Sequence, residues 1–506
     1  MVCRFLLVSL CIDAILGEVT VSERKRKLKE MTKGNHLGDA YATTLNRMKA
    51  QKGSRSRIGM DALMWVSNSE RPLHTSELCH ALGVKIGSAD LDVENVPSIR
   101  TLVGCSLGLI AVEASSSTVR LVHLTLQEYL SNNPSLFQAP HSMMAEVCLT
   151  YLNFRCIREL SPALSSAPPS FPFVKYASCY WGKHTGRQKA GGVTSLALEI
   201  LNGFEQHISS RFLLLHYDKN RHWPEPGFGR SSSHNGFTGL HGAAFFGLGE
   251  IVAALLAMKE WNINKTDAVG RTALAWAATR GHENVVRILL RQKDVNANPR
   301  DIESGRTPLL WAAKGGYEGV AKLLLEREDT NPNTRDTEYG QTPLWWAAKG
   351  GYEGVAKLLL ERKDTNPNTR DIQYGQTPLL YAARGGHEGV VKLLLEREDI
   401  NPGIPGLDGE TALVLAASRG RTGIVKLLSK PKPSRSIAID TEKAPGRSSP
   451  EPPTCPPPPR PLPPAARPLF PIAIPFFVII SSILLFYLFA RIGHSLPALS
   501  LESFYR

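Results

Sequence analysis

The sequence Thr307-Pro-Leu-Leu-Trp-Ala-Ala-Lys-Gly-Gly-Tyr-Glu-Gly-Val-Ala-Lys-Leu-Leu-Leu-Glu326 decides the fold, because close copies of it recur along the chain. A T-x-L pattern, followed by alanines, a glycine and an apolar run, begins at threonines that are 34 or 35 residues apart: Thr238, Thr272, Thr307, Thr342, Thr377 and Thr411. A period in this range is typical of a solenoid in which each repeat is one supersecondary unit.

Each copy predicts two short helices and a turn. The threonine hydroxyl can cap the first helix, and the following proline lacks the N–H that this position leaves unpaired. The paired alanines allow close packing, and Leu323 to Leu325 give the second helix its apolar stripe. Residues 331–336 carry turn chemistry that predicts a projecting finger. The pattern resembles the ankyrin repeat, which implies six repeats over residues 236–430 that bind protein partners.

Composition limits the class of protein. A length of 506 residues is typical of two to four domains. The net charge of +13 and a pI near 9.3 favour acidic partners or anionic membrane surfaces. The eight cysteines are scattered without a C-x-x-C spacing, and none lies in the repeats. This usage predicts a reduced, cytosol-facing protein without a structural zinc site.

The region before the repeats predicts three parts. Residues 1–57 are interpreted as an N-terminal helical remnant, whose apolar run after Phe5 is either a signal peptide or a buried helix of a larger domain. Residues 58–132 predict helices over 58–67, 75–82 and 96–106 and a hairpin of 109–113 with 119–124, an order typical of a winged helix. Residues 133–235 predict a helical connector that covers the first repeat, with its aromatic residues in the core: Phe173, Tyr176, Tyr180 and Trp181.

The winged-helix segment has a more detailed resemblance. Met64-Trp-Val, Glu77-Leu-Cys-His-Ala-Leu and Leu121-Val-His-Leu-Thr-Leu-Gln-Glu-Tyr-Leu are similar to the winged helix that follows the NACHT nucleotide-binding domain in fungal NLR-like (STAND-type) proteins. The resemblance implies an ATPase domain upstream and a role for His123 on the β-phosphate of ADP. This chain departs from the family because it has no G-x-x-x-x-G-K-[ST] phosphate loop. His123 therefore also has a purely structural interpretation, as a histidine satisfied by backbone groups.

Other chemistry has little support in the sequence. The predicted third helix of the winged helix carries only Arg100, and three acidic residues precede it, which argues against binding of nucleic acid. No H-E-x-x-H or G-x-S-x-G motif occurs. We therefore expect a protein that is not an enzyme and that uses no cofactor or metal.

The sequence after residue 430 changes in character. Residues 431–468 are rich in proline and predict a disordered linker, either a spacer or a P-x-x-P ligand. Residues 469–490 are 22 residues without a charge, which as a helix reach roughly 33 Å, enough to span a bilayer core of about 30 Å. Only residues 491–506 follow. This order predicts a single-pass tail anchor that leaves the bulk of the chain in the cytosol.

A recognition surface is predicted on the concave face of the repeats. Cations precede the threonines or follow the paired alanines in a regular column: Arg271, Arg280, Arg306, Lys314, Lys349, Arg384 and Arg419. The column predicts an acidic protein partner, with simple solvation of the repeat surface as the alternative. Trp345 stands where other copies have alanine or leucine, which favours a hot spot. The recurring aromatics are predicted to stack between repeats: Trp276, Trp311, Trp346 and Tyr381.

These features predict a mainly α fold, in which a winged helix and a helical connector precede an ankyrin-repeat solenoid and a C-terminal transmembrane helix. We interpret the chain as a membrane-anchored interaction scaffold with NLR-like recognition. One alternative is the regulatory half of a nucleotide-dependent NTPase whose ATPase domain is missing from this chain. Another is a transcriptional regulator that acts through the winged helix.

Overall fold

A computed structural model describes residues 20–32, 37–164, 166–188, 191–219, 235–258 and 261–430. These ranges belong to one compact unit, residues 1–433. The predicted linker, transmembrane segment and tail, and the apolar run after Phe5, lie outside the described residues. Within the described ranges, no helix is both long and apolar enough to cross a membrane.

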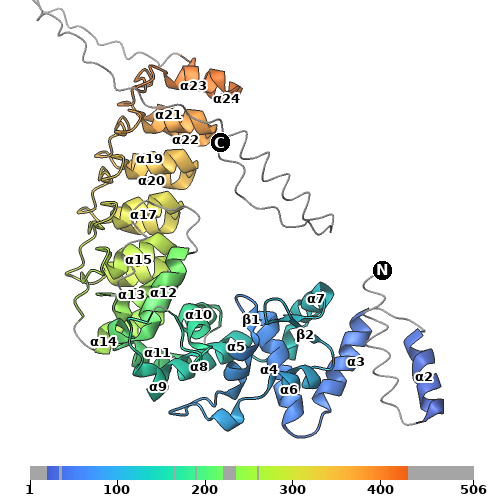
Figure 1. Ribbon diagram of the computed structural model, residues 1–506. Helices are drawn as coiled ribbons and strands as arrows, with labels where there is room; N and C mark the ends of the chain where they lie inside the picture. The colour runs from blue at the N-terminus through green and yellow to red at the C-terminus, as the bar shows by residue number, and fades with distance from the viewer. Residues whose placement is uncertain are drawn as a thin grey trace, which may run out of the picture. The chain divides into compact units, whose positions relative to one another are not determined.

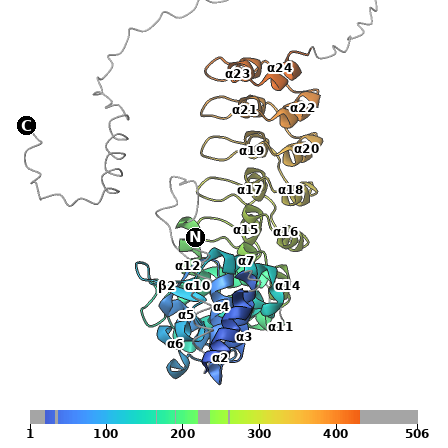
Figure 2. The ribbon, with the colours of Figure 1, turned by 90° about the vertical axis from the view of Figure 1, so that its right-hand side faces the viewer.

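The repeats form a stack of helix pairs (Figures 1 and 2). First helices pack on first helices and second helices on second helices, and the described residues contain six such pairs, the number that the sequence predicts. The pairs are α13 (Gly239–Phe246) with α14 (Gly249–Met258), α15 (Ala273–Arg280) with α16 (Glu283–Leu290), α17 (Pro308–Gly315) with α18 (Glu318–Leu325), α19 (Pro343–Gly350) with α20 (Glu353–Glu361), α21 (Pro378–Gly385) with α22 (Glu388–Glu396), and α23 (Ala412–Ser418) with α24 (Thr422–Leu428).

The first helix of an internal repeat begins and ends as the sequence predicts. In α17 the Thr307 hydroxyl accepts the backbone N–H of Leu310, and Pro308 occupies the first turn. The helix ends at Gly316, whose φ of 69° lies in the left-handed region that favours glycine. Ala312 and Ala313 are fully buried, which lets the neighbouring helices approach closely.

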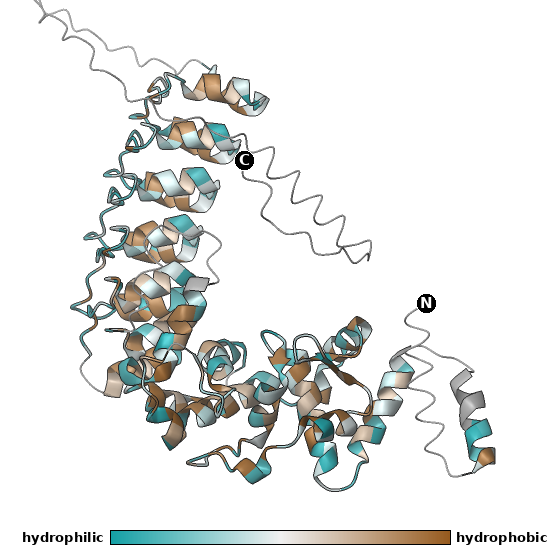
Figure 3. Cartoon of the chain, viewed as in Figure 1, coloured by the Kyte–Doolittle hydropathy of each residue, from teal (hydrophilic) through white to brown (hydrophobic). Residues whose placement is uncertain are grey.

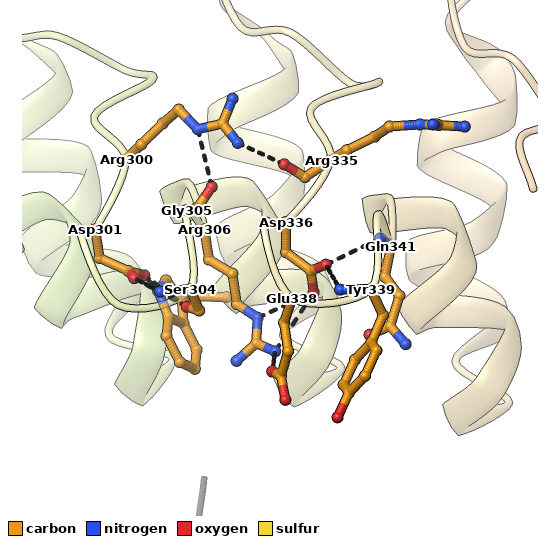
Figure 4. Close-up of polar contacts among 11 residues, drawn as sticks. Arg300, Asp301, Ser304, Gly305, Arg306, Arg335, Asp336, Glu338, Tyr339 and Gln341 are labelled. Atoms are coloured by element: carbon orange, nitrogen blue, oxygen red, sulfur yellow. Dashed lines mark hydrogen bonds and ion pairs between the residues drawn. The ribbon is translucent and has the colours of Figure 1, made fainter. Parts of the chain in front are cut away.

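The turns between repeats form fingers that bond to one another (Figure 4). In the finger at Asp336, the carboxylate Oδ1 accepts the backbone N–H groups of Tyr339 at 3.1 Å and Gln341 at 3.0 Å. The backbone N–H of Thr337 donates to the carbonyl of Ser304 in the preceding finger at 2.8 Å. Hydrophilic residues predominate on the fingers, whereas hydrophobic residues gather on the helices (Figure 3). Each finger is therefore held both by its own repeat and by the one before it.

The winged helix is confirmed and extended by one strand. It contains α4 (Ser54–Asn68), α5 (Thr75–Gly83), the short helix η1 (Val93–Asn95), α6 (Ile99–Cys105), β2 (Ile110–Glu113) and β3 (Thr118–Leu121). The sequence did not predict β1 (Leu73–His74), which pairs antiparallel with β3 in a sheet of order β1-β3-β2. Helix α6 begins later than predicted, because Pro97 disfavours helix before it and Ser98 accepts the N–H of Thr101 as the cap.

The predicted boundary at residue 57 is too late. Of the two helices before it, α2 (Val21–Thr32) and α3 (Leu37–Lys49), the second packs on α4. Tyr41, Leu45 and Met48 of α3 are buried, and the Tyr41 hydroxyl lies 2.8 Å from Thr125 Oγ1 of α7 (Leu124–Asn132). Helix α3 is therefore part of the winged-helix core.

The connector joins the winged helix to the first repeat. It consists of η2 (Pro134–Leu136), α8 (Pro140–Asn153), α9 (Arg155–Arg158), α10 (Val174–Arg187), α11 (Gly191–Leu201), η3 (Phe204–Gln206) and α12 (Ile208–Lys219). The four aromatic residues predicted as core are buried. The ring of Phe173 lies 5.5 Å from that of Trp65 in α4, and the ring of Trp181 lies 5.0 Å from that of Phe246 in α13. The connector thus covers the outer side of the first repeat, as predicted.

Two glycines of α10 allow this junction to be tested. A Cβ at Gly182 would lie 2.1 Å from Cγ of Phe246, whereas a Cβ at Gly186 would have no atom within 4 Å. We expect Gly182→Ala to lower the free energy of unfolding by about 1–3 kcal/mol through overpacking. Gly186→Ala should raise it by up to about 1 kcal/mol, since alanine is the better helix former. Urea unfolding followed by far-UV circular dichroism measures both, and equal midpoints would show that α10 does not pack on α13.

Candidate protein-interaction surface

Cations lie at one equivalent position in three consecutive repeats. Lys314, Lys349 and Arg384 each stand seven residues after the repeat's threonine, in the last turn of α17, α19 and α21. Lys314 is half-buried, and Lys349 and Arg384 are exposed. Because the first helices stack on one another, these three charges are presented one repeat apart.

Aromatic rings lie beside these cations. Each cation is three residues after an aromatic residue, so the two share a helix face. The Nζ of Lys314 lies 5.2 Å from the ring centroid of Trp311 and 4.8 Å from that of Trp346 in the next repeat. The Nζ of Lys349 lies 5.1 Å from the Trp346 ring. Such contacts stabilise a cation by about 0.5–2 kcal/mol, depending on desolvation.

Trp346 and Tyr381 remain partly exposed between the cations. We call the surface formed by these side chains the aromatic–cation face, and its members are Lys314, Trp346, Lys349, Tyr381 and Arg384. The sequence predicted the two aromatics only as stacking residues. The signal that could have identified them is their spacing of three residues from a cation in consecutive copies.

Arg271 and Arg306 do not belong to this surface, and their prediction as exposed cations was wrong. Each is only 1% exposed. The Arg306 Nη2 lies 3.4 Å from Asp336 Oδ2 and 3.3 Å from Glu338 Oε2, both in the next finger (Figure 4). The finger of the following repeat folds over the guanidinium and supplies its counter-charges, which removes the arginine from solvent.

The buried arginines bridge tryptophans of neighbouring repeats. The guanidinium carbon of Arg271 lies 4.9 Å from the Trp276 centroid and 4.4 Å from the Trp311 centroid. That of Arg306 lies 5.1 Å from Trp311 and 5.2 Å from Trp346. A guanidinium group therefore lies between each ring and the next, in place of the direct ring stacking that the sequence predicted.

Trp345 is a core residue, so its prediction as a surface hot spot was wrong. It is 1% exposed, and its Nε1 donates to Asp371 Oδ2 of the next finger at 3.2 Å. Its ring centroid lies 4.3 Å from that of Tyr381 and 5.1 Å from that of Trp346. The position three residues after the threonine faces the next repeat, which covers any side chain placed there.

Burial and neighbouring charges shift the pKa values of two groups on the face. Although Lys349 reaches the surface, burial lowers its pKa, and the positive charge of Arg306 lowers it further. The pKa of Tyr381 is raised, first by burial and then by the charge of Asp371. A negative group beside Lys349 would raise the pKa of this lysine again, because it would oppose the effects of burial and of the Arg306 charge.

Arg280 and Arg419 occupy a different position, eight residues after the threonine. The Arg280 guanidinium carbon lies 4.6 Å from the ring of Phe245 and 5.8 Å from that of Tyr217, so this side chain packs on aromatic groups. Arg419 is exposed at the end of α23. The structure does not join these two to the aromatic–cation face, and their predicted role in binding stays a prediction.

His123 has a structural role in the winged helix. Its Nδ1 accepts the backbone N–H of Thr125 at 3.2 Å and lies 2.8 Å from Thr125 Oγ1, so it caps α7. The residue also lines a pocket of about 540 Å³ with Arg71 and Arg120. Across the described ranges, no cluster of His, Cys, Asp or Glu side chains could hold a metal ion.

Arg306 and Lys314 provide a test of the buried ion pair between Arg306 and Asp336. Arg306→Gln leaves the buried Asp336 without its counter-charge, so we expect the free energy of unfolding to fall by about 3 kcal/mol or more. Lys314→Gln removes a half-buried cation from the rings of Trp311 and Trp346 and should cost about 1 kcal/mol or less. Urea unfolding of the two variants and the wild type checks this order. Equal losses would mean that Arg306 is not the buried partner of Asp336.

Comparison with known protein families agrees with this architecture. The model described as ankyrin repeats (3 copies) matches residues 209–301, 293–371 and 363–439. The model described as the winged helix domain of GPI inositol-deacylase matches residues 45–143, which include α4 to α7. A search of curated proteins gave no match. The chain therefore contains ankyrin repeats and a winged-helix domain of the GPI inositol-deacylase type.

Proposed function

We propose that this chain is a membrane-anchored protein-interaction scaffold, and that its ankyrin stack binds an acidic segment of a partner protein. Ankyrin repeats generally mediate contacts between proteins. The observation that carries the proposal is the aromatic–cation face, where Lys314, Lys349 and Arg384 recur one repeat apart beside partly exposed rings.

The chemistry of the face fits carboxylates spaced along an extended segment. Each partner carboxylate can reach an ammonium or guanidinium group, while apolar groups between the carboxylates contact Trp346 and Tyr381. The positive charges also accelerate encounter with an acidic partner, and this effect weakens as salt screens it. Arg306 adds little net charge at the surface, because Asp336 and Glu338 pair with it.

A charge-reversal experiment with a matched control tests the face. The face variant carries Lys314→Glu, Lys349→Glu and Arg384→Glu. The control variant carries Lys322→Glu, Lys357→Glu and Lys392→Glu, which change exposed cations at the same spacing on the second helices. Both variants change the net charge equally.

The probe is a displayed library of random peptides, selected against the detergent-solubilised full chain. We expect wild-type selection to enrich peptides rich in Asp and Glu. Their binding should fall at least about tenfold in the face variant, since electrostatic complementarity is lost, and should persist in the control. Binding should also weaken from low to physiological salt. Selection of peptides without acidic enrichment, or equal losses in both variants, would overturn the proposed partner class.

The membrane tether is a separate part of the proposal. Residues 469–490 contain no charge and follow a proline-rich stretch, which supports a spanning segment. We expect deletion of 469–490 to release the protein from membranes in a carbonate extraction, because the apolar segment is gone. Deletion of 445–466, which has the same length, should leave the protein in the pellet. If both deletions stay in the pellet, another part of the chain holds the membrane.

NLR-like signalling is the finer proposal about the cellular role. It rests on the similarity of the winged-helix segment to the corresponding segment of NACHT proteins, and includes the alternative that this chain is the regulatory half of an NTPase. The capping contacts of His123 support the structural interpretation of that residue rather than a phosphate contact. We therefore propose that the repeats bind the partner protein. We propose no nucleotide-binding role for the winged helix.

A further inference from the structure

The last described repeat exposes an apolar surface that internal repeats bury. Leu413 and Val414 of α23 are 40% and 49% exposed, and Ala417 is exposed as well. The equivalent residues of the three preceding repeats are at most 1% exposed: Leu309, Leu310 and Ala313; Leu344, Trp345 and Ala348; Leu379, Leu380 and Ala383. The surface of α23 formed by Leu413, Val414 and Ala417, the end face, thus has the shape that receives another first helix.

The other end of the stack is closed. A Cβ at Gly239 of α13 would lie 2.0 Å from the carbonyl oxygen of Leu201 in α11, and the rings of Phe204 and Phe237 lie 6.0 Å apart. The connector therefore already occupies the outer side of the first repeat. With only the end face open among the described repeats, self-association there gives a closed pair and not a filament.

The charges around α23 are complementary to themselves in an antiparallel arrangement. Asp408 and Glu410 precede the helix, and Arg419 follows it. The two preceding copies carry neutral residues at the positions of Glu410 and Arg419: Gln341 and Gln376, and Gly350 and Gly385. The second repeat shares the cation, since Arg280 stands at the position of Arg419, but it carries Arg271 and not an acidic residue at the position of Glu410. A second α23 related by a two-fold axis would place its Arg419 against Glu410 and its Glu410 against Arg419.

We propose that the end face binds the end face of a second copy of this chain, with the two α23 helices antiparallel. Leu413, Val414 and Ala417 form the apolar centre, where the small side chain of Ala417 permits close approach. Glu410 and Arg419 form ion pairs at the two rims. The pairing is independent of the aromatic–cation face, which lies on other repeats and whose test leaves Arg419 unchanged.

The first experiment measures pairing between two full-length copies that carry different tags. After detergent solubilisation, capture of one tag should recover the other. Leu413→Glu with Val414→Glu should reduce the recovery at least about tenfold, because interface centres carry most of the binding energy. The matched control, Ile372→Glu with Leu407→Glu, changes two apolar residues on the fingers that are more exposed than Leu413 and Val414, and it should leave recovery unchanged.

A charge exchange tests the antiparallel geometry without changing the apolar centre. Glu410→Arg alone and Arg419→Glu alone should each weaken pairing with itself, since each creates like-charge contacts across the two-fold axis. A mixture of the two variants restores opposite charges at both rims and should restore recovery toward the wild-type level. This reciprocal rescue is specific to an antiparallel pair.

Three outcomes would overturn the proposal. The first is a wild-type chain that recovers no second copy. The second is a control variant that loses pairing as much as the end-face variant. The third is recovery that appears only after deletion of residues 431–506, which would mean that the chain's own C-terminal segment covers the end face. Failure of rescue in the charge exchange would overturn the antiparallel arrangement.

Discussion

Burial of one repeat against the next is the constraint on which this structure depends. A pair of helices of only seven to ten residues cannot bury its apolar side alone. The paired alanines bring consecutive first helices close together, and residues such as Leu344 and Trp345 become core only when the following repeat covers them. The two ends of the stack differ in how their apolar sides are covered. The connector covers the first repeat, whereas Leu413 and Val414 of the last repeat remain exposed.

Local signals made most of the repeat architecture predictable. A threonine cap, a proline in the first turn and a left-handed glycine each act within one turn of helix, so their effects follow from sequence spacing. The positions of Arg306 and Trp345 could not be obtained in this way. Their burial depends on Asp336 and Asp371, which belong to the next finger and are 30 and 26 residues away. The spacing of the sequence predicts their positions on or next to a helix. It does not predict that the following finger covers them.

The winged helix also combines elements that local sequence predicts with elements that depend on distant residues. Three helices and a hairpin are predicted from apolar patterns, but β1 has only two residues and no alternation from which a strand could be predicted. Its existence depends on pairing of Leu73 and His74 with the distant strand β3. Helix α3 likewise belongs to the winged-helix core, because Tyr41, Leu45 and Met48 are buried and the helix packs on α4. The sequence of α3 alone does not predict this packing.

The buried arginines change how the charge of the repeat surface should be understood. Arg306 is paired with Asp336 and Glu338, so the net positive charge of the face comes from Lys314, Lys349 and Arg384. Arg306 still acts on this face, because its charge adds to the burial that lowers the pKa of Lys349. An anionic group that binds beside Lys349 opposes both effects and raises that pKa again. By linkage, the lysine that binds such a group holds its proton more tightly, and ligand binding is strongest where Lys349 is charged. The buried Arg306 and the exposed Lys349 are therefore coupled electrostatically, and a residue without access to solvent influences the protonation of a surface lysine.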